Sequence, residues 1–366
     1  MADIDDYRSG FGSSPDGISK IIHDMSKSNV GFHRWKHVQN HTWPFQVYKL
    51  YNEELSRFLW ANEAASKYTF SKLGKDGADD NDAPTKHFSL PAHRISSMKT
   101  IKGWADVYDD SKNWQRLNCV MAISSNMETY LASVVALAIE SNPGVLVGAS
   151  QYIDGAKLLK EGGLDEKVYD NNVTACSKGA WPDRLAAFEK LFGPAPQSYH
   201  DGLTTLERMR KLRNNLGHAF GRDIDASRNF TFNKKQEVDR IQLQTLVKYL
   251  DKAYNIIQDV DEFLLDNHIG EFQAIYAYHM HRDEFMGGEI DRALKLKQFY
   301  GEHDQSVGKT FCKGLVSYYE SILAANLTEH KIRQVKVVNL CSYGKRKKIS
   351  EVQEHGGAGT ATRRVS

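Results

Sequence analysis

The segment KLRNNLGHAFGRD, residues 211–223, places Arg213, Asn214 and His218 within two helical turns. Arginine carries a permanent planar cation that matches phosphate oxygens, and histidine is the side chain that moves protons near neutral pH. Cleavage of a phosphodiester needs a proton acceptor or donor at the ribose 2′-OH and at the leaving oxygen, and positive charge beside the phosphate. This chemistry requires no metal ion, and Asn214 would hold the arginine or the phosphate by hydrogen bonds.

Helical geometry limits how these three side chains can converge. Positions four apart lie about forty degrees apart around a helix, so Asn214 and His218 share a face, whereas Arg213 lies roughly a hundred degrees from Asn214. One straight helix cannot aim all three at one atom. Either Gly217 weakens the helix and lets the imidazole turn or enter a loop, or two copies of the segment assemble the full site.

A structural explanation of the same residues exists. In a chain with 14 histidines, about one Arg-x4-His pair is expected by chance. Basic residues near a helix C-terminus also interact favourably with the helix dipole. A second, looser pair, Arg34 and His41, precedes Trp43 and is not carried by a long amphipathic helix, so we interpret it as coincidental.

Four helices are predicted around the motif. Apolar residues recur at three- and four-residue steps, and Pro and Gly mark the ends of several of these stretches. The predicted helices span residues 116–141, 182–192, 203–216 and 238–265. The sequence therefore predicts an all-α bundle over residues 116–270 and a mainly α fold class for the chain.

The flanking regions read as an N-terminal and a C-terminal extension. Residues 1–115 are partly helical, with a helix at 43–70, a Gly- and Asp-rich loop at 74–86, and an ambiguous stretch at 87–110 that has room for short strands. Residues 271–343 form a helical region with helices at 289–300 and 307–323. The remainder, residues 344–366, is a basic, Gly-rich tail that we expect to be disordered.

Charge and composition restrict the partners. The chain has 366 residues, 41% hydrophobic and 26% charged, which is typical of a globular protein, and its formal net charge is only +2. Any nucleic-acid affinity must therefore come from a local patch. Basic residues near the motif would supply an RNA-binding patch: Arg208, Arg210, Lys211, Arg222 and Arg228. The basic residues 345–348 either contact RNA phosphates as well or are simply a solvated tail.

The sequence favours a soluble, cytoplasmic protein with no membrane partner. The first residues are acidic and polar, unlike a secretory signal, and the longest apolar stretch, within residues 134–139, is too short to span a bilayer. The cysteines are scattered without metal-ligand spacing, which favours packing over disulfides or zinc. They are Cys119, Cys176, Cys312 and Cys341.

Two further patterns are rejected as sites. In residues 301–310, six residues separate two glycines where a phosphate-binding loop needs four, and no strand is expected before them. His279, His281 and Asp283 alternate, which on a strand would place them on one face for a metal ion, but the flanking pattern is helical. We therefore expect neither a metal ion nor a cofactor.

The segment ERMRKLRNNLGHAFGRD, between one helix and another that ends in FLLDNHIGEF, resembles the HEPN superfamily. The signature of that family is Arg, often followed by Asn, Asp or His, and then His after four to six intervening residues. The stretch AISSNMETYLASVVALAI looks like the first core helix of the family with its embedded acidic residue, and GAWPDRLAAFEKLFG looks like the second. The resemblance covers residues 116–270, under half of the chain.

The resemblance implies a metal-independent endoribonuclease that acts as a homodimer, with two motifs facing each other across a cleft. The products would carry a 2′,3′-cyclic phosphate and a 5′-OH. On this reading Arg213 stabilises the transition-state phosphate, His218 transfers a proton and Asn214 assists. Glu128 either pairs with Arg213 and orients it or is a solvated charge on a helix face.

By analogy with the family, we expect a toxin or anti-phage defence role, with an activator or regulatory partner acting through the extensions. The alternative is a non-catalytic HEPN-type binding or scaffold module for RNA, a nucleotide or a partner protein. In that case Arg213 and His218 serve structure or ligand contact. A two-fold interface that brings two motifs together would distinguish the enzyme from the module.

Overall fold

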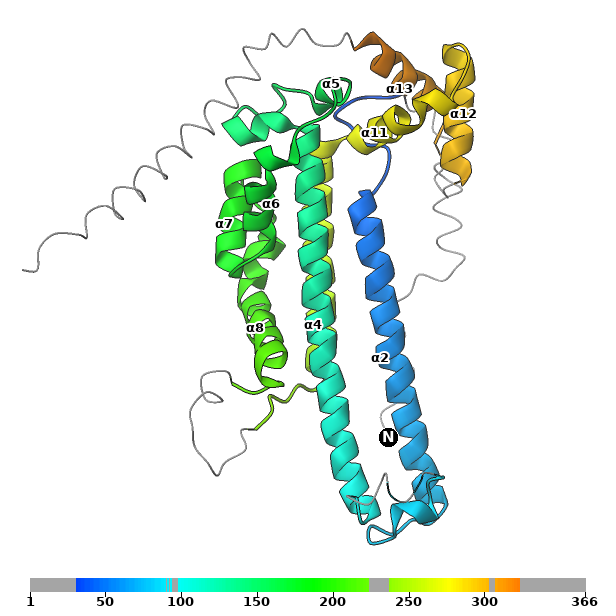
Figure 1. The fold of residues 1–366 in the computed structure, drawn as a ribbon, viewed down its shortest axis with the longest axis vertical. Coiled ribbons are helices and arrows are strands. Elements are labelled where there is room, and N and C mark those ends of the chain that lie inside the picture. The colour runs from blue at the N-terminus through cyan, green and yellow to red at the C-terminus, as the bar shows by residue number, and fades with distance from the viewer. Residues whose placement is uncertain are drawn as a thin grey trace, which may run out of the picture. The chain divides into compact units, whose positions relative to one another are not determined.

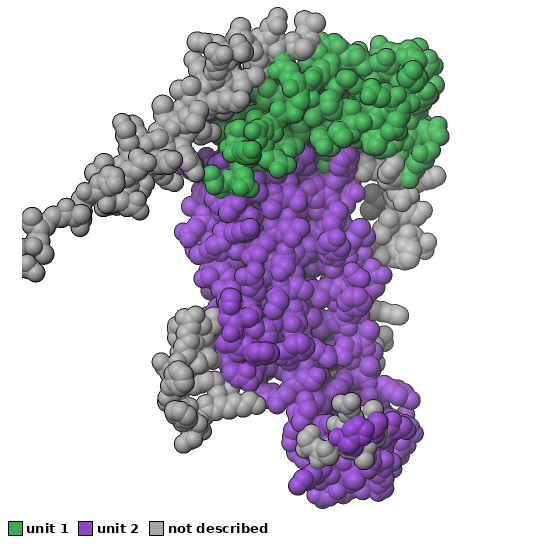
Figure 2. Space-filling view, viewed as in Figure 1, with its two compact units in different colours: residues 1–38, 139–171, 270–366 green, residues 39–138, 172–269 purple. Residues whose placement is uncertain are grey.

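The computed structural model describes residues 31–89, 91, 93, 98–223, 237–302 and 307–322. These residues are mainly helical and contain no strand beyond an isolated bridge between His33 and Lys36, so the predicted fold class is confirmed. The chain forms two compact units (Figures 1 and 2). Unit 1 contains residues 1–38, 139–171 and 270–366, and unit 2 contains residues 39–138 and 172–269. Both units are discontinuous in sequence, whereas the predicted division was linear.

Unit 2 holds most of the long helices. Its elements are α2 (Trp43–Lys75), η2 (Pro84–Lys86), most of α4 (Ile101–Ser141) and of α6 (Asp170–Ser177), α7 (Trp181–Phe192), α8 (Gln197–Ala219), α10 (Leu243–Leu264) and a π-helical turn, η5 (Leu265–Ile269). Helix α8 packs against α7 and α10, and α10 also packs against α2. The antiparallel pair α2 and α4 is joined by side chains, with Arg116 Nη2 2.8 Å from Glu63 Oε1.

Helix α4 begins at Ile101, well before the predicted start at residue 116, so strands in 98–110 are excluded. The apolar spacing of the sequence does not predict residues 101–115 as helical, because this part of α4 packs through a cluster of aromatic rings and not through a regular apolar stripe. Trp104 stacks on Tyr108 and lies against Phe70 and Phe88. By length and composition α4 alone, among the described helices, is apolar enough to cross a membrane, but the core helix of a soluble protein passes the same test, and half of its most apolar window is buried.

A buried carboxylate on α10 joins three helices of unit 2. Asp261 is fully buried and accepts hydrogen bonds from the backbone of Thr42, at 3.0 Å, and from the hydroxyl of Tyr130, at 2.9 Å. The Thr42 hydroxyl also donates to Asp261 and accepts the Phe45 N–H, so it caps α2. Burial of a charge is tolerated here because several donors satisfy it.

Unit 1 is built from short helices. Its elements are η3 (Pro143–Val147), α5 (Gly155–Leu159), η4 (Glu166–Val168), α11 (Phe272–His281), η6 (Arg282–Glu284), α12 (Glu289–Glu302) and α13 (Lys309–Ser321). Helices α12 and α13 pack together, and α11 packs against α5 and α13. The predicted helices at 289–300 and 307–323 correspond to α12 and α13, although residues 303–306 and those from 323 onward, with the predicted tail, lie outside the described residues.

Three separate segments of unit 1 meet around Arg34. Its guanidinium lies 2.9 Å from Asp154 Oδ1 and 2.8 Å from the Ser141 hydroxyl, and only 5% of the residue is exposed. Gly270, with φ +52°, lies so close that an added Cβ would be 2.4 Å from the Arg34 carbonyl oxygen. Arg34 therefore has a structural role, in agreement with the interpretation of its pairing with His41 as coincidental.

Glu271 is a buried carboxyl group that is expected to make the stability of unit 1 depend on pH. The side chain is buried and accepts the Val38 N–H, and burial raises its pKa from 4.5 to about 7. A carboxyl group with a higher pKa in the folded chain stabilises the fold below its unfolded pKa, and this contribution is lost as pH rises through the folded pKa. As pH rises from about 4.5 to 7, we expect the ionisation of Glu271 to lower the free energy of unfolding by up to roughly 3 kcal/mol.

Substituting Glu271→Gln should remove that part of the pH dependence. Chemical denaturation at pH 5 and pH 8 measures it, with Glu289→Gln, an exposed position of α12, as the matched control. An identical pH dependence in Glu271→Gln and the parent protein would contradict the prediction.

Candidate functional site

The motif residues lie near the end of α8, in unit 2. Arg213 and Asn214 are partly exposed, and His218 and Gly217 are exposed. No atom lies within 4 Å of a Cβ added to Gly217. Within the described part of the chain, no hydrogen bond or ion pair is found for the imidazole of His218. The histidine is therefore accessible from solvent.

Gly217 does not break the helix, so the first of the two predicted alternatives, in which it frees His218 to turn, does not hold. Helix α8 continues to Ala219 and ends where Phe220 and Gly221 adopt positive φ values of 53° and 75°. The Gly221 N–H donates to the Asn215 carbonyl at 3.0 Å, which closes the last turn. The left-handed C-terminal cap, and not the weak helix propensity of Gly217, decides where the helix ends.

An unbroken helix separates the two central side chains. Arg213 and His218 are five positions apart, which places them about 140° apart around the axis. Asn214 and His218, four positions apart, lie on one face as predicted. A single copy of α8 therefore does not aim Arg213 and His218 at one atom.

Arg213 is held by Glu128 of α4. Of the two predicted roles for Glu128, pairing with Arg213 is therefore the one that the structure contains. Arg213 Nη2 lies 3.4 Å from Glu128 Oε2, and its Nη1 donates to Asn214 Oδ1 at 3.3 Å. The arginine side chain remains 39% exposed. Glu128 and Asn214 thus fix a cation that still faces solvent.

Sequence reasoning missed Arg184, the stronger partner of Glu128. Its Nη2 lies 2.8 Å from Glu128 Oε1, and its side chain is only 2% exposed. Its guanidinium also lies 4.2 Å from the ring centroid of Trp181 and donates to the Gly179 carbonyl. The available signal was its position on the buried stripe of α7, three residues after Trp181 and four before Phe188.

The predicted basic patch is divided between faces of α8. Arg210 lies 2.8 Å from Glu207, which partly neutralises it. Arg208 and Lys211 instead line a pocket next to α10. The prediction of one patch rested on the clustering of basic residues along the chain. Arg208 and Arg213 are five positions apart, however, so they point about 140° apart around the helix axis. Arg222 follows the helix, partly buried, and Arg228 and residues 345–348 lie outside the described residues.

The remaining candidates behave as packing residues. His279 lies in α11, where its Nδ1 is 2.5 Å from the Tyr319 hydroxyl, and no cluster of metal-binding side chains occurs among the described residues. Cys119, Cys176 and Cys312 are free thiols, and burial raises the pKa of the last two to about 12. Helix α12, not a strand, precedes the rejected phosphate loop.

Comparison of the chain with protein-family models, with curated proteins and with solved structures finds no significant match.

Proposed function

We propose that this chain is a metal-independent, HEPN-like endoribonuclease that acts as a homodimer. The observation that carries the proposal is the accessible imidazole of His218, one turn beyond a solvent-facing Arg213 that Glu128 and Asn214 hold in place. A proton-transfer group and a fixed cation are the two requirements for cleaving a phosphodiester through its own 2′-OH.

Gly217 supports the pairing of two α8 helices. It is exposed in the last turn of α8 and lies between Arg213 and His218, although glycine is a weaker helix former than alanine. The bare backbone at this position lets a second helix or a phosphate approach closely. Across a two-fold axis, Arg213 of one copy would then face His218 of the other.

In the proposed reaction the ribose 2′-oxygen attacks phosphorus while its proton passes to His218. Arg213 stabilises the additional negative charge on the non-bridging oxygens. The bond from phosphorus to the 5′-oxygen breaks, and that oxygen takes a proton from water, while the imidazolium later returns its proton to solvent. The products carry a 2′,3′-cyclic phosphate and a 5′-OH, so atoms and charge balance without a metal ion.

The proposal is tested by incubating the purified chain with total cellular RNA in excess EDTA and determining the chemical ends of the fragments. Fragments with 2′,3′-cyclic phosphate and 5′-OH ends are expected. Fragments with 5′-phosphate ends would contradict the proposed reaction, and intact RNA from a folded dimer would favour a binding module or a requirement for the activator.

A composite site predicts complementation between inactive variants. Arg213→Ala and His218→Ala proteins should each be inactive, but mixed dimers recover one intact pairing of Arg213 with His218. After subunit exchange we expect up to about a quarter of the parent rate, because half of the dimers are mixed and each has one of two pairings. The rate is measured on a fluorescent RNA, and no recovery despite verified exchange would contradict a site shared between copies.

A cell-damaging RNase in the cytoplasm fits a toxin or anti-phage role under the control of an activator or regulatory partner, by analogy with the family. One observation favours the alternative, a non-catalytic module that binds RNA, a nucleotide or a partner protein. Glu128 lies closer to the buried Arg184 than to Arg213, so the acidic residue also has a structural role that does not require catalysis.

A further inference from the structure

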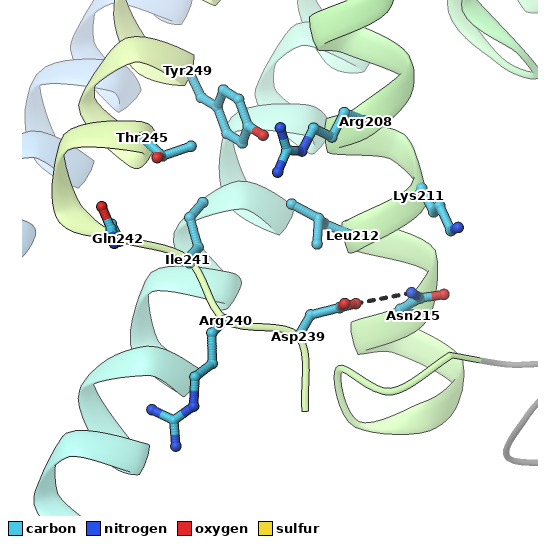
Figure 3. A pocket seen from close by; sticks show the side chains of 10 residues that line it. All are labelled: Arg208, Lys211, Leu212, Asn215, Asp239, Arg240, Ile241, Gln242, Thr245 and Tyr249. Atoms are coloured by element: carbon cyan, nitrogen blue, oxygen red, sulfur yellow. Dashed lines mark hydrogen bonds between the residues drawn. The ribbon is translucent and has the colours of Figure 1, made fainter. Parts of the chain in front are cut away.

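A separate pocket of about 390 Å³ lies between α8, the start of α10 and the extended segment before α10 (Figure 3). Its volume is within the range of small-ligand sites. Asn113 fixes the segment that forms one wall, since its side chain accepts the Ile241 N–H at 2.9 Å and donates to the Asp239 carbonyl at 2.8 Å. The wall therefore does not depend on a bound molecule for its position.

Positive charge dominates the pocket. Arg208 projects from α8 into the pocket, Lys211 lines its edge with its ammonium group directed away from Tyr249, and Arg240 extends from the opposite wall, where it pairs with Asp110. The one carboxylate in the lining, Asp239, accepts a hydrogen bond from Asn215 Nδ2 at 2.9 Å. Arg208 is thus the cation that is left to attract an anion inside the pocket.

The pocket also receives the N-terminus of α10. The N-cap residue Gln242 lines the pocket and makes no side-chain capping hydrogen bond, and Thr245 lines it one turn later. The first N–H groups of a helix have no partner within the helix and attract negative charge. A 22-residue helix such as α10 presents a full dipole here.

Tyr249 supplies an independent indication of a ligand. The residue is only 5% exposed, and its hydroxyl is buried and has no hydrogen-bond partner among the described residues. Figure 3 shows the hydroxyl directed into the pocket, towards Arg208. Burial raises the pKa of Tyr249, so the phenol stays protonated as a donor. A buried donor without a partner is costly unless something accepts its hydrogen bond.

We propose that this pocket binds a terminal phosphate monoester, with the phosphate between Arg208 and the α10 N-terminus and an oxygen on the Tyr249 hydroxyl. A terminal phosphate offers three oxygens and nearly two negative charges to these converging donors. The same chemistry is carried by a 5′-mononucleotide and by the phosphorylated end of an RNA. The inference stands on the pocket alone and does not require ribonuclease activity.

The test is calorimetric titration of the full chain with adenosine 5′-monophosphate, adenosine, and a short RNA with or without a 5′-phosphate. Binding that requires the phosphate is expected, and it should weaken as salt rises. Phosphate-dependent binding of the RNA alone identifies an RNA end as the ligand, and binding of the monophosphate alone identifies a mononucleotide. Equal affinities with and without phosphate, or no binding at millimolar concentration, would overturn the proposal.

Two variants locate the site. Arg208→Ala should weaken phosphate-dependent binding about tenfold or more, and Tyr249→Phe, which keeps the buried ring, by about fivefold. Lys190→Ala, which removes an exposed cation from α7, is the matched control and should bind as the parent does. Melting temperatures confirm that the variants are folded. Parent-like affinity in both folded pocket variants would place the phosphate elsewhere and overturn the proposal.

Discussion

Alanine in place of His218 is expected to lower the rate of RNA cleavage by about 100- to 10,000-fold, the usual contribution of a proton-transfer group. The same substitution should leave the free energy of unfolding within about 0.5 kcal/mol of the parent value. The reason is structural, because the imidazole is exposed on α8 and makes no hydrogen bond or ion pair within the described part of the chain. Cleavage rates on a defined RNA and chemical denaturation measure the two effects.

His200→Ala provides a matched control for that experiment. His200 lies on the same helix, its side chain is 38% exposed, and its Nε2 lies 3.0 Å from Glu189 Oε1. Its loss should leave cleavage unchanged. Cleavage by folded His218→Ala at the parent rate would exclude His218 as the proton-transfer group and leave the binding module as the better interpretation.

Glu128→Ala is expected to lower the free energy of unfolding by about 3 to 5 kcal/mol, because it leaves a buried charge without its partner. That charge is Arg184, which is 2% exposed and lies 2.8 Å from Glu128. Its Nη1 already has no hydrogen-bond partner among the described residues. Denaturant unfolding monitored by circular dichroism gives the difference.

Comparing Arg213→Ala with Glu128→Ala separates an effect on stability from an effect on activity. Its bond to Glu128 is long, at 3.4 Å, and the side chain is 39% exposed, so its loss should cost less than about 1 kcal/mol. Adding Arg184→Met to Glu128→Ala should recover much of the lost stability, since replacing a buried ion pair with apolar groups is often close to neutral. A Glu128→Ala protein as stable as the parent would show that Arg184 does not depend on this carboxylate.

Three helix starts were predictable from the sequence, whereas α8 begins six residues before its predicted start at residue 203. Helices α2, α7 and α12 begin within one residue of their predicted starts, because proline or acidic residues mark the first turn and the apolar spacing is regular. The start of α10 was predicted five residues too early, because Asn113 holds the preceding segment extended. The residues next to the start of α10 cannot reveal such a contact, because Asn113 lies more than a hundred positions earlier in the sequence.

The candidate site was predictable in its residue types but not in its geometry. The pairing of Glu128 with Arg213 was among the predicted alternatives, and the structure contains it. Arg184 was missed because an arginine on a buried stripe looks like surface charge until its partner on another helix is known. The phosphate pocket was missed for the same reason: Arg208 and Tyr249 belong to different helices, and only tertiary packing brings them together.

The segmented construction of unit 1 has a consequence for synthesis on the ribosome. Arg34 is made before its partners Ser141 and Asp154, which follow it by a hundred residues or more, and before Gly270, the glycine that packs on its backbone and lies further along the chain. The described residues of unit 2 are complete once residue 269 has emerged. Vectorial synthesis therefore allows the unit that carries Arg213 and His218 to fold first, while the segment around Arg34 completes its contacts only after residue 270 has been made.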